Sequence, residues 1–283
     1  MSNTSSLQQF CITHHFCVAE LLFSVTFTGY ENGIRMLPSF KPFEIEKDET
    51  EDSDPHPVEP LLFNLTVDNS LHAEPRDNRE RIREFDTGNG STVVDQLKNG
   101  GYQYIIKDIN HSDCCLLITD KEFRHCRCAL NGSFLMRSFG LNNAIMLIYA
   151  FAGASRGTIL MHASVVRQNG YGYAFIAKSG TGKSTQVSNW LKYLPGCDLM
   201  NDDNPVVRII NGKSFIFGSP WSGKTPCYRN IKAPLGAVTR IDRALTNSIE
   251  KEDALKAFVS LLPSVSSMKW DERLYETICD TIT

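Results

Sequence analysis

Apolar and polar residues alternate along residues 17–27, which is the clearest short-range pattern in the first part of the chain. A period of two places every second side chain on the same face of a strand. The alternation therefore predicts one half-buried β-strand over residues 17–27. One face would carry Cys17, Ala19, Leu21, Phe23, Val25 and Phe27, and the other Val18, Glu20, Leu22, Ser24 and Thr26.

Shorter strand patterns follow up to about residue 130. Residues 63–67 alternate in the same way. Residues 92–97 and 102–106 flank Asn99-Gly100-Gly101, and glycines at such a position accept the positive φ angles of a hairpin turn. Residues 115–119 and 123–128 form a similar pair. The first 130 residues are therefore predicted to be mostly antiparallel β-structure.

From residue 141 the pattern changes to a mixture of strands and helices. Residues 141–153 are apolar on nearly all sides, as in a buried helix, and the apolar run 144–154 is too short to cross a bilayer. Asn211-Gly212 predicts a hairpin. Strands are predicted over 158–166, 173–177, 206–210, 214–217 and 237–241, and helices over 183–193, 253–262 and 271–282. These elements predict an α+β protein with a β-rich N-terminal region, residues 1–140, and a second domain, residues 141–283.

Composition and charge exclude several functional classes. A hydrophobic content of 42% excludes wholesale disorder. The net charge of -3, from 29 basic and 32 acidic residues, leaves no basic excess for nucleic acid or an anionic membrane. The apolar stretch 16–27 contains Glu20 and Ser24, so we expect neither a signal peptide nor a membrane span there. The acidic run 44–54 is expected to be a solvated loop, in preference to an acidic docking segment.

Cysteine usage points to a reducing compartment. The nine cysteines are odd in number and include no Cys-x-x-Cys pair, so we expect reduced thiols and a cytoplasmic protein. Two groups place histidine and cysteine close together, and in principle they could bind zinc across a hairpin. They are His111 with Cys114 and Cys115, and His125 with Cys126 and Cys128. Simple packing of the thiols is the favoured interpretation.

The segment 177–185 carries the most specific chemical signal in the sequence. It fits the P-loop pattern G-x-x-x-x-G-K-[ST], except that Ala177 replaces the first glycine. Gly180 and Gly182 let backbone N–H groups turn inward to form an anion site at the start of a helix. Lys183 would reach the β- and γ-phosphates of ATP, and Ser184 would bind Mg²⁺, or Mn²⁺ in its place. The remaining nucleotide-binding positions would be Ser179, Thr181 and Thr185.

Two flanking motifs extend this prediction. Residues 199–203 form a short apolar approach that ends in Asp202 and Asp203, as a metal site after a P-loop requires. An exposed acidic turn is the alternative. His162 lies in an apolar strand that precedes the P-loop strand through a turn at residues 168–170, and that hairpin would bring it beside the phosphates. A core histidine is the alternative there.

Residues 218–230 form a distinctive stretch rich in Gly, Pro, Trp, Lys and Arg. The tripeptide Gly223-Lys224-Thr225 imitates a P-loop ending, but Pro226 follows it and the upstream glycine is missing. The segment is therefore interpreted as a loop that closes over ATP or holds the acceptor, with Lys224 and Arg229 as the groups that would meet phosphate. A rigid surface loop is the alternative.

The three ordered motifs, 161–164, 177–185 and 201–203, resemble the catalytic domain of HPr kinase/phosphorylase. They also resemble the nucleotide-binding half of ATP-dependent phosphoenolpyruvate carboxykinase, and the similarity covers about residues 155–245. Among such proteins, the three motifs look most like those of uncharacterised HPr-kinase-like proteins of bacteria. This resemblance implies a P-loop domain of the type shared by the two families, with His162 and Asp203 at the metal and Asp202 as the general base. It also implies a homo-oligomer.

The sequence thus favours a kinase that transfers the γ-phosphate of ATP to a hydroxyl, most simply a serine, of a protein or peptide. Lys183, Asp202 and His162 would be its catalytic residues. A nucleotide-binding regulatory protein that transfers nothing is one alternative. A small-molecule enzyme of the carboxykinase type is the other.

Overall fold

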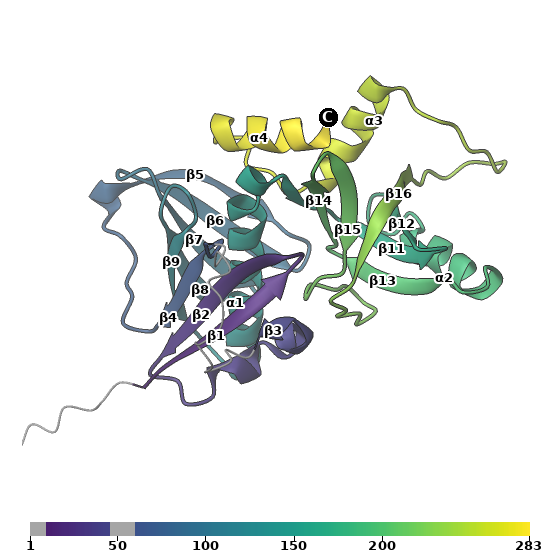
Figure 1. Cartoon of the computed structure of the whole chain (residues 1–283). Coiled ribbons are helices and arrows are strands. Elements are labelled where there is room, and N and C mark those ends of the chain that lie inside the picture. The colour runs from purple at the N-terminus through teal and green to yellow at the C-terminus, as the bar shows by residue number, and fades with distance from the viewer. Residues whose placement is uncertain (1–9, 46–59) are drawn as a thin grey trace, which may run out of the picture. The chain divides into compact units, whose positions relative to one another are not determined.

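The computed structural model describes residues 10–45 and 60–283 and divides the chain into two units. The first unit runs up to Tyr149 without the turn Val18–Glu20, which clusters with the second unit, Ala150–Thr283. Each unit contains one large β-sheet and few helices, so the chain has a mixed composition compatible with the α+β class (Figure 1). Most of the acidic run 44–54 lies outside the described residues.

The first unit contains a nine-stranded sheet in the order β3-β1-β2-β4-β9-β8-β7-β6-β5. Its strands are β1 (Cys11–Val18), β2 (Leu21–Thr28), β3 (Glu44–Ile45), β4 (Asn64–Asp68), β5 (Arg79–Asp86), β6 (Gly90–Leu97), β7 (Tyr102–Asp108), β8 (Asp113–Thr119) and β9 (His125–Leu130). Short 3₁₀ turns lie at Gly33–Met36, Pro38–Phe43 and Arg76–Asn78. The hairpins β6–β7 and β8–β9 confirm two sequence predictions. However, β4 pairs in parallel with both β2 and β9, so the sheet is not uniformly antiparallel.

The single strand predicted over residues 17–27 is wrong, because the chain reverses there. Ala19 and Glu20 adopt φ angles of 48° and 63°, and they form a two-residue turn between β1 and β2. Two consecutive positive φ angles are typical of the tight turns that fit the twist of a hairpin. The turn contains no glycine or asparagine, so the sequence carried no signal for it.

Helix α1 (Phe134–Ala152) begins seven residues before the predicted start at residue 141. By length and composition alone it could cross a membrane. In the structure it packs closely within the first unit. A Cβ atom at Gly140 would lie only 2.8 Å from Cys115 Cβ, and Leu141, Ile145 and Ile148 are fully buried. Its apolar surface is thus used in part to form the core of this unit.

The second unit contains a seven-stranded sheet in the order β10-β14-β15-β16-β12-β11-β13. Its strands are β10 (Thr158–Leu160), β11 (Ala163–Gln168), β12 (Tyr171–Ile176), β13 (Asp198–Asp203), β14 (Val206–Ile210), β15 (Lys213–Phe217) and β16 (Lys232–Arg240). Its helices are α2 (Lys183–Tyr193), α3 (Ala254–Leu261) and α4 (Glu272–Ile282), with short 3₁₀ turns at Ala154–Arg156 and Leu262–Ser264. The predicted hairpin at Asn211-Gly212 is confirmed, as is the helix starting at Lys183.

The strand predicted over residues 158–166 is in fact two strands. β10 pairs with β14, whereas β11 pairs with β12 and β13. Between them the backbone N–H of Met161 donates to Pro205 O and that of His162 donates to Ser264 O, at 3.1 and 2.6 Å. The chain therefore leaves one ladder and enters another at His162.

Helix α2 packs on β11, β12 and β13, and it defines one face of this part of the sheet (Figure 1). Val187 of α2 packs with Val166 and Phe175 of the strands, and Trp190 adds an edge-on ring contact with Phe175 at 5.4 Å.

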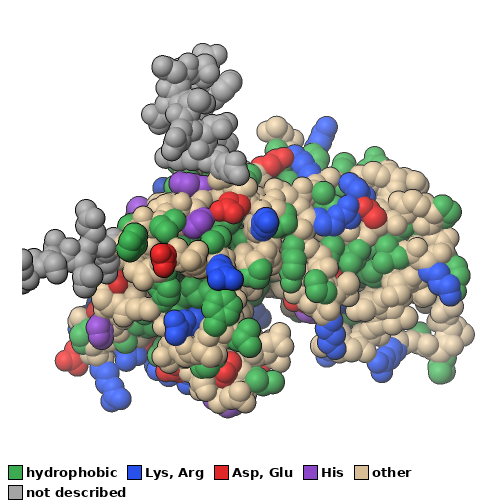
Figure 2. Space-filling model, turned by 90° about the horizontal axis from the view of Figure 1, so that it is seen from below, with side chains coloured by type: hydrophobic (Ala, Val, Ile, Leu, Met, Phe, Trp, Pro, Cys, Tyr) green, Lys and Arg blue, Asp and Glu red, His purple; other side chains and the backbone are tan. Residues whose placement is uncertain are grey.

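On the face of the molecule in Figure 2, basic side chains are interspersed with acidic and apolar ones.

Candidate functional site

Three neighbouring strands of the second sheet have one of their ends on the same side of the sheet. β11 runs antiparallel to both β12 and β13, with Ser164 opposite Phe175 on one side and Asp202 on the other. The end of β12, the start of β11 and the end of β13 therefore lie side by side. This register brings the loop after β12 to the edge where His162 and Asp203 are found, as the three sequence motifs predicted.

The glycine-rich loop, residues 177–182, connects β12 to α2. Gly180 and Gly182 have φ angles of 75° and 135°, which favour glycine, and an added Cβ at either would meet nothing within 4 Å. The requirement for glycine is thus conformational. Gly182 is the N-cap of α2, so the N–H groups of the first turn, from Lys183 onward, face outward at the positive end of the helix dipole. The predicted residues Ser179, Ser184 and Thr185 are exposed around this end.

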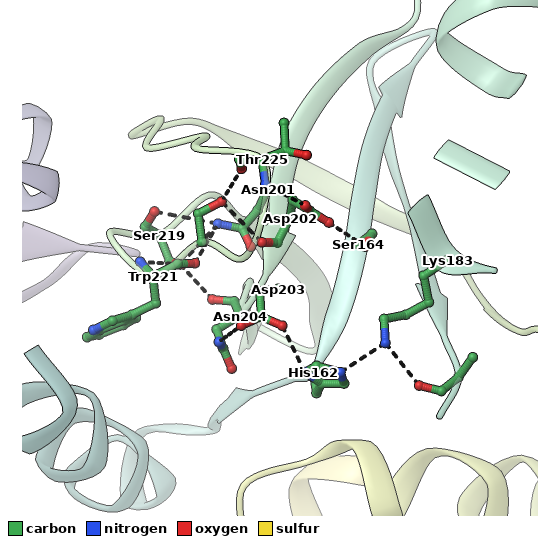
Figure 3. A network of polar contacts seen from close by, with 12 residues as sticks. His162, Ser164, Lys183, Asn201, Asp202, Asp203, Asn204, Ser219, Trp221 and Thr225 are labelled. Atoms are coloured by element: carbon green, nitrogen blue, oxygen red, sulfur yellow. Dashed lines mark hydrogen bonds and ion pairs between the residues drawn. The ribbon is translucent and has the colours of Figure 1, made fainter. Parts of the chain in front are cut away.

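The Lys183 side chain points across the edge of the sheet toward His162 (Figure 3). Its Nζ lies 2.9 Å from His162 Nε2 and donates to Ala177 O at 3.0 Å. Burial lowers the pKa of Lys183, although the charges of Asp203 and Asp202 act in the opposite direction. The ammonium group is therefore held between His162 and the carbonyl of Ala177.

His162 connects Lys183 to Asp203. Its Nδ1 lies 3.0 Å from Asp203 Oδ1, and the two side chains are 47% and 32% exposed. An ammonium group has donors only, so His162 Nε2 must be the acceptor toward Lys183. The proton then resides on Nδ1, which donates to Asp203. This exposed chain of three groups argues against a core histidine.

Asp203 adopts a backbone conformation that is unusual for its residue type. Its φ angle is 141°, in the region that favours glycine, and such strain costs about 1–3 kcal/mol. Its Oδ2 accepts from Asn204 Nδ2 at 2.8 Å, and its backbone forms an isolated antiparallel bridge with Ser222. Strained residues that the surroundings hold in place cluster at functional sites.

Asp202 belongs to a different network from that of Asp203. Its Oδ1 accepts from Ser164 Oγ at 2.7 Å, and its Oδ2 accepts from the backbone N–H of Thr225 at 3.2 Å (Figure 3). Ser164 lies opposite Phe175, which packs against α2, so Asp202 lies on the face that α2 covers. Only 9% of Asp202 is exposed. The acid pair thus has one buried and one open carboxylate.

The loop of residues 218–230 covers the outer edge of β13. The fully buried Asn201 donates from Nδ2 to Ser219 Oγ and Trp221 O, both at 3.1 Å. Gly223 N donates to Asp202 O, and a Cβ on Gly223 would lie 3.1 Å from that oxygen. Edge strands expose unpaired backbone groups, and a covering loop protects them. The loop therefore has a structural role, and its exposed turn also lies against the acid pair.

Of the two cations predicted in this loop, Lys224 is exposed and follows Gly223, whose backbone lies against the acid pair. Arg229 lies instead at the start of β13, where it forms an ion pair with Asp198 at 2.8 Å. Burial alone would raise the pKa of Asp198, but hydrogen bonds from Arg167 and Arg229 outweigh it and lower the pKa. The structure thus does not bring Arg229 to the glycine-rich loop.

Arg243 is a site residue that sequence reasoning missed. β16 runs parallel to β12, with Arg240 opposite Ile176, so the carboxyl ends of both strands reach the same edge. Arg243 follows there and donates from Nη2 to Gly180 O at 2.6 Å. The sequence does show an arginine shortly after a predicted strand. Its position near the glycine-rich loop can be inferred only when the pairing of that strand with β12 is known.

The cysteines of the two candidate zinc groups are packed thiols within the first unit, whereas His111 and His125 are exposed. Cys114, Cys115, Cys126 and Cys128 are all buried. A hydrogen bond with Cys128 and burial raise the pKa of Cys115, and burial raises that of Cys126. Zinc binds the thiolate form, which this environment disfavours. Among residues 10–45 and 60–283, no group of three His, Cys, Asp or Glu side chains is arranged to hold a metal ion.

No protein-family model and no curated protein matches this sequence. The interpretation of the site therefore depends on its own geometry. That geometry joins a glycine-rich loop, a lysine, a histidine and an acid pair at one edge of one sheet.

Proposed function

We propose that this protein is an ATP-dependent phosphotransferase similar to HPr kinase/phosphorylase, acting in the cytoplasm on a serine hydroxyl of a protein or peptide. In this proposal the second unit is a P-loop domain of the HPr kinase and carboxykinase type. The observation that carries it is the hydrogen-bonded chain Asp203–His162–Lys183, which starts at the acid pair and ends at the N-terminus of α2.

The nucleotide phosphates would bind at the glycine-rich loop and the first turn of α2. Outward N–H groups and the helix dipole favour anions there. Lys183 forms a hydrogen bond with His162. A phosphate would replace His162 as its partner, because a charge-assisted bond to an anion is stronger than one to a neutral imidazole. Arg243 supports the loop from its carbonyl side.

The donor set near the acid pair fits a magnesium ion that comes with the nucleotide. Magnesium at phosphate sites uses one or two carboxylates, and phosphate oxygens and water complete its shell. Asp203 offers a partly exposed carboxylate and Ser184 an exposed hydroxyl, and both provide the hard oxygen ligands that Mg²⁺ prefers. When bound, the ion would neutralise phosphate charge.

The acceptor hydroxyl would be deprotonated by Asp202. Ser164 holds one oxygen of this carboxylate, and the other accepts only the Thr225 amide among the bonds described. An acceptor that displaced this amide would place its hydroxyl against Oδ2. The proton would pass to Asp202 as the oxygen attacked the γ-phosphorus and ADP departed.

The test of this proposal is the affinity for Mg-ATP measured by calorimetry. Lys183→Ala should weaken binding about tenfold to a hundredfold, the value of one lost charge-assisted bond, while the circular dichroism spectrum stays unchanged. Lys192→Ala is the matched control, since Lys192 lies in the last turn of the same helix over the Tyr193 ring. Equal affinity in both variants would contradict the nucleotide site.

Turnover measurements separate the competing functions. A regulatory nucleotide-binding protein would bind Mg-ATP without forming ADP in the presence of serine-containing peptides. An enzyme of the carboxykinase type would instead require a carboxylic-acid substrate.

Sedimentation of the purified chain tests the proposed homo-oligomer.

A further inference from the structure

The turn of residues 222–226, here called the loop tip, folds around one serine hydroxyl. Ser222 Oγ lies 3.1 Å from Asp202 O and 2.7 Å from Thr225 O, and it accepts from Cys227 N at 3.2 Å. Gly223, Lys224, Thr225 and Pro226 are all exposed. The loop tip is therefore held at its base by Ser222, while its outer residues face solvent directly beside the acid pair.

Three residues with hydroxyl groups bond to Asp202, and they differ in what their hydroxyls can do. Ser164 is 1% exposed and lies within β11, so its hydroxyl can only hold the carboxylate. The hydroxyl of Ser222 is committed to the bonds that shape the loop tip. Thr225 contacts Asp202 through its backbone amide, and it is exposed. Thr225 is thus the accessible hydroxyl residue attached to this carboxylate.

The Thr225 hydroxyl lies within a short reach of the proposed base. Its amide nitrogen is 3.2 Å from Asp202 Oδ2. The hydroxyl oxygen is three covalent bonds from that nitrogen, so it lies no more than about 7 Å from the same carboxylate oxygen. Asp202 lies on the sheet face covered by α2, whose N-terminus would hold the phosphates. A local shift of the exposed loop tip would therefore bring the hydroxyl between base and γ-phosphate.

We propose that Thr225 is an autophosphorylation site, modified within the same chain by the proposed kinase centre. This inference rests on the proposed function. The Thr225 Oγ1 attacks the γ-phosphorus of ATP, the bond from that phosphorus to the β-phosphate bridging oxygen breaks, and ADP leaves. The hydroxyl proton passes to Asp202. One phosphothreonine and one ADP form for each ATP consumed, with no further reactant.

Charge gives this modification a structural consequence. A phosphate group adds about -1.5 to -2 charges at neutral pH. Asp202 and Asp203 lie directly beneath the loop tip, whereas Lys224 is the cation next to it in sequence. Repulsion from the acid pair would drive the phosphorylated tip outward and free Asp202 Oδ2. Phosphorylation of Thr225 would thereby open the base to an external acceptor.

The experiment is to incubate the full chain with Mg-ATP and to locate phosphate by tandem mass spectrometry. Calorimetry on the same preparation measures binding of the β,γ-imido analogue of ATP. This analogue tests whether the nucleotide site binds, because its γ-phosphate is not transferred. The variants are Thr225→Ala, which removes the acceptor, Thr225→Ser, which retains a hydroxyl, and Lys183→Ala. Ser214→Ala is the matched control, because Ser214 is an exposed hydroxyl residue on β15 of the same unit.

The expected result is phosphate on Thr225 at a rate independent of protein concentration. Thr225→Ala and Lys183→Ala should reduce total incorporation at least tenfold, whereas Thr225→Ser and Ser214→Ala should retain it. If the analogue binds and Thr225 stays unmodified, or phosphate appears only elsewhere, this inference is overturned and the proposed nucleotide site stands. If the analogue does not bind at all, both proposals fail together.

Discussion

The two sheets place carboxylates in opposite environments. In the first unit, Asp95 is 1% exposed and is surrounded by donors. Arg79 bonds its Oδ2, Arg81 bonds its Oδ1, and Gln103 Nε2 donates to Oδ2 at 3.1 Å. Asp95 lies on β6, and these three donors come from β5 and β7, the two strands that pair with it. Two cationic donors and one amide donor therefore hold this buried carboxylate in place and match its charge.

In the second unit, Asp203 is partly exposed and strained, whereas Asp95 is buried and bonded to two arginines. It has one histidine and one asparagine partner, remains a third exposed, and has a φ angle that favours glycine. Asp202 is buried like Asp95, but it accepts from a serine and a backbone amide, and within residues 10–45 and 60–283 no cation is bonded to it. The described bonds therefore give Asp202 two neutral donors, whereas Asp95 has two cationic donors and one neutral donor.

The contrast between Asp95 and the acid pair distinguishes carboxylates that stabilise the fold from carboxylates that can take part in a reaction. A structural acid has its charge matched by neighbouring strands. An acid that takes part in chemistry lies at the end of a strand, where the backbone departs from regular pairing. Its negative charge is then not matched by cations on neighbouring strands.

The largest expected effect is on catalysis by the acid pair. Asp202→Asn should leave Mg-ATP affinity nearly intact and reduce phosphotransfer by roughly a hundredfold to ten-thousandfold, the contribution of a general base. Asp203→Asn should instead weaken Mg-dependent nucleotide binding, and His162→Ala should moderately affect both. Calorimetry and turnover are measured for all three variants. If Asp202→Asn retains its turnover, the base must lie elsewhere.

The next largest effect is on stability, in the first unit. Asp95→Ala leaves Arg79 and Arg81 without their shared partner, and breaking a buried ion pair typically costs 3–5 kcal/mol, so we expect a loss of about 3 kcal/mol because Arg81 is half exposed. Urea unfolding measures it, with the exposed Asp77→Ala as the control. Mg-ATP affinity of the folded protein should not change. A stable Asp95→Ala variant with weakened nucleotide binding would reverse the roles assigned to the two units.

Much of the fold follows from local sequence signals. The hairpins at Asn99-Gly100 and Asn211-Gly212 and the helix starting at Lys183 were predictable, because their turn and cap residues have strong backbone preferences. The turn at Ala19-Glu20 was not, because its residues have no such preference and tertiary packing holds their positive φ angles. The strand β5 was missed because its sequence is mostly charged; in the fold it pairs along its length with β6, and two of its arginines bond Asp95.

The candidate site was predictable in its members but not in its arrangement. The motif order identified His162, Lys183 and the acid pair. Which acid faces which partner depends on the register of β11 with β13 and on the irregular backbone at Asp203. The contribution of Arg243 depends on the parallel pairing of β12 with β16 across a long stretch of sequence. Non-local pairing of this kind leaves no signature in a single sequence.

A smaller effect is expected from Arg243 at the carbonyl side of the glycine-rich loop. Arg243→Ala removes the bond to Gly180 O and should weaken Mg-ATP binding by about tenfold or less, since the arginine is exposed. Arg243→Lys should restore part of the affinity, because an ammonium can also donate to that carbonyl. The control is Arg273→Ala on α4, an exposed arginine of the same unit. Equal affinities for the Arg243 and Arg273 variants would show that the loop holds its shape unaided.

The smallest effect concerns Asp198, which starts the strand that Asp203 ends. Asp198 is matched by Arg167 and Arg229, and these bonds lower its pKa, so its ionised form stabilises the folded state. Because a third of the side chain is exposed, Asp198→Asn should cost at most about 1 kcal/mol at neutral pH. The pKa is lower in the folded than in the unfolded chain, so this stabilisation is present above about pH 4 and is lost as the pH falls further. Urea midpoints measured between pH 7 and pH 3 should therefore differ most at neutral pH and converge in acid. The control Asp280→Asn on α4 should show no such convergence, because Asp280 has no arginine partner among the described ion pairs. A difference that stayed constant with pH would contradict the coupling of Asp198 to Arg167 and Arg229.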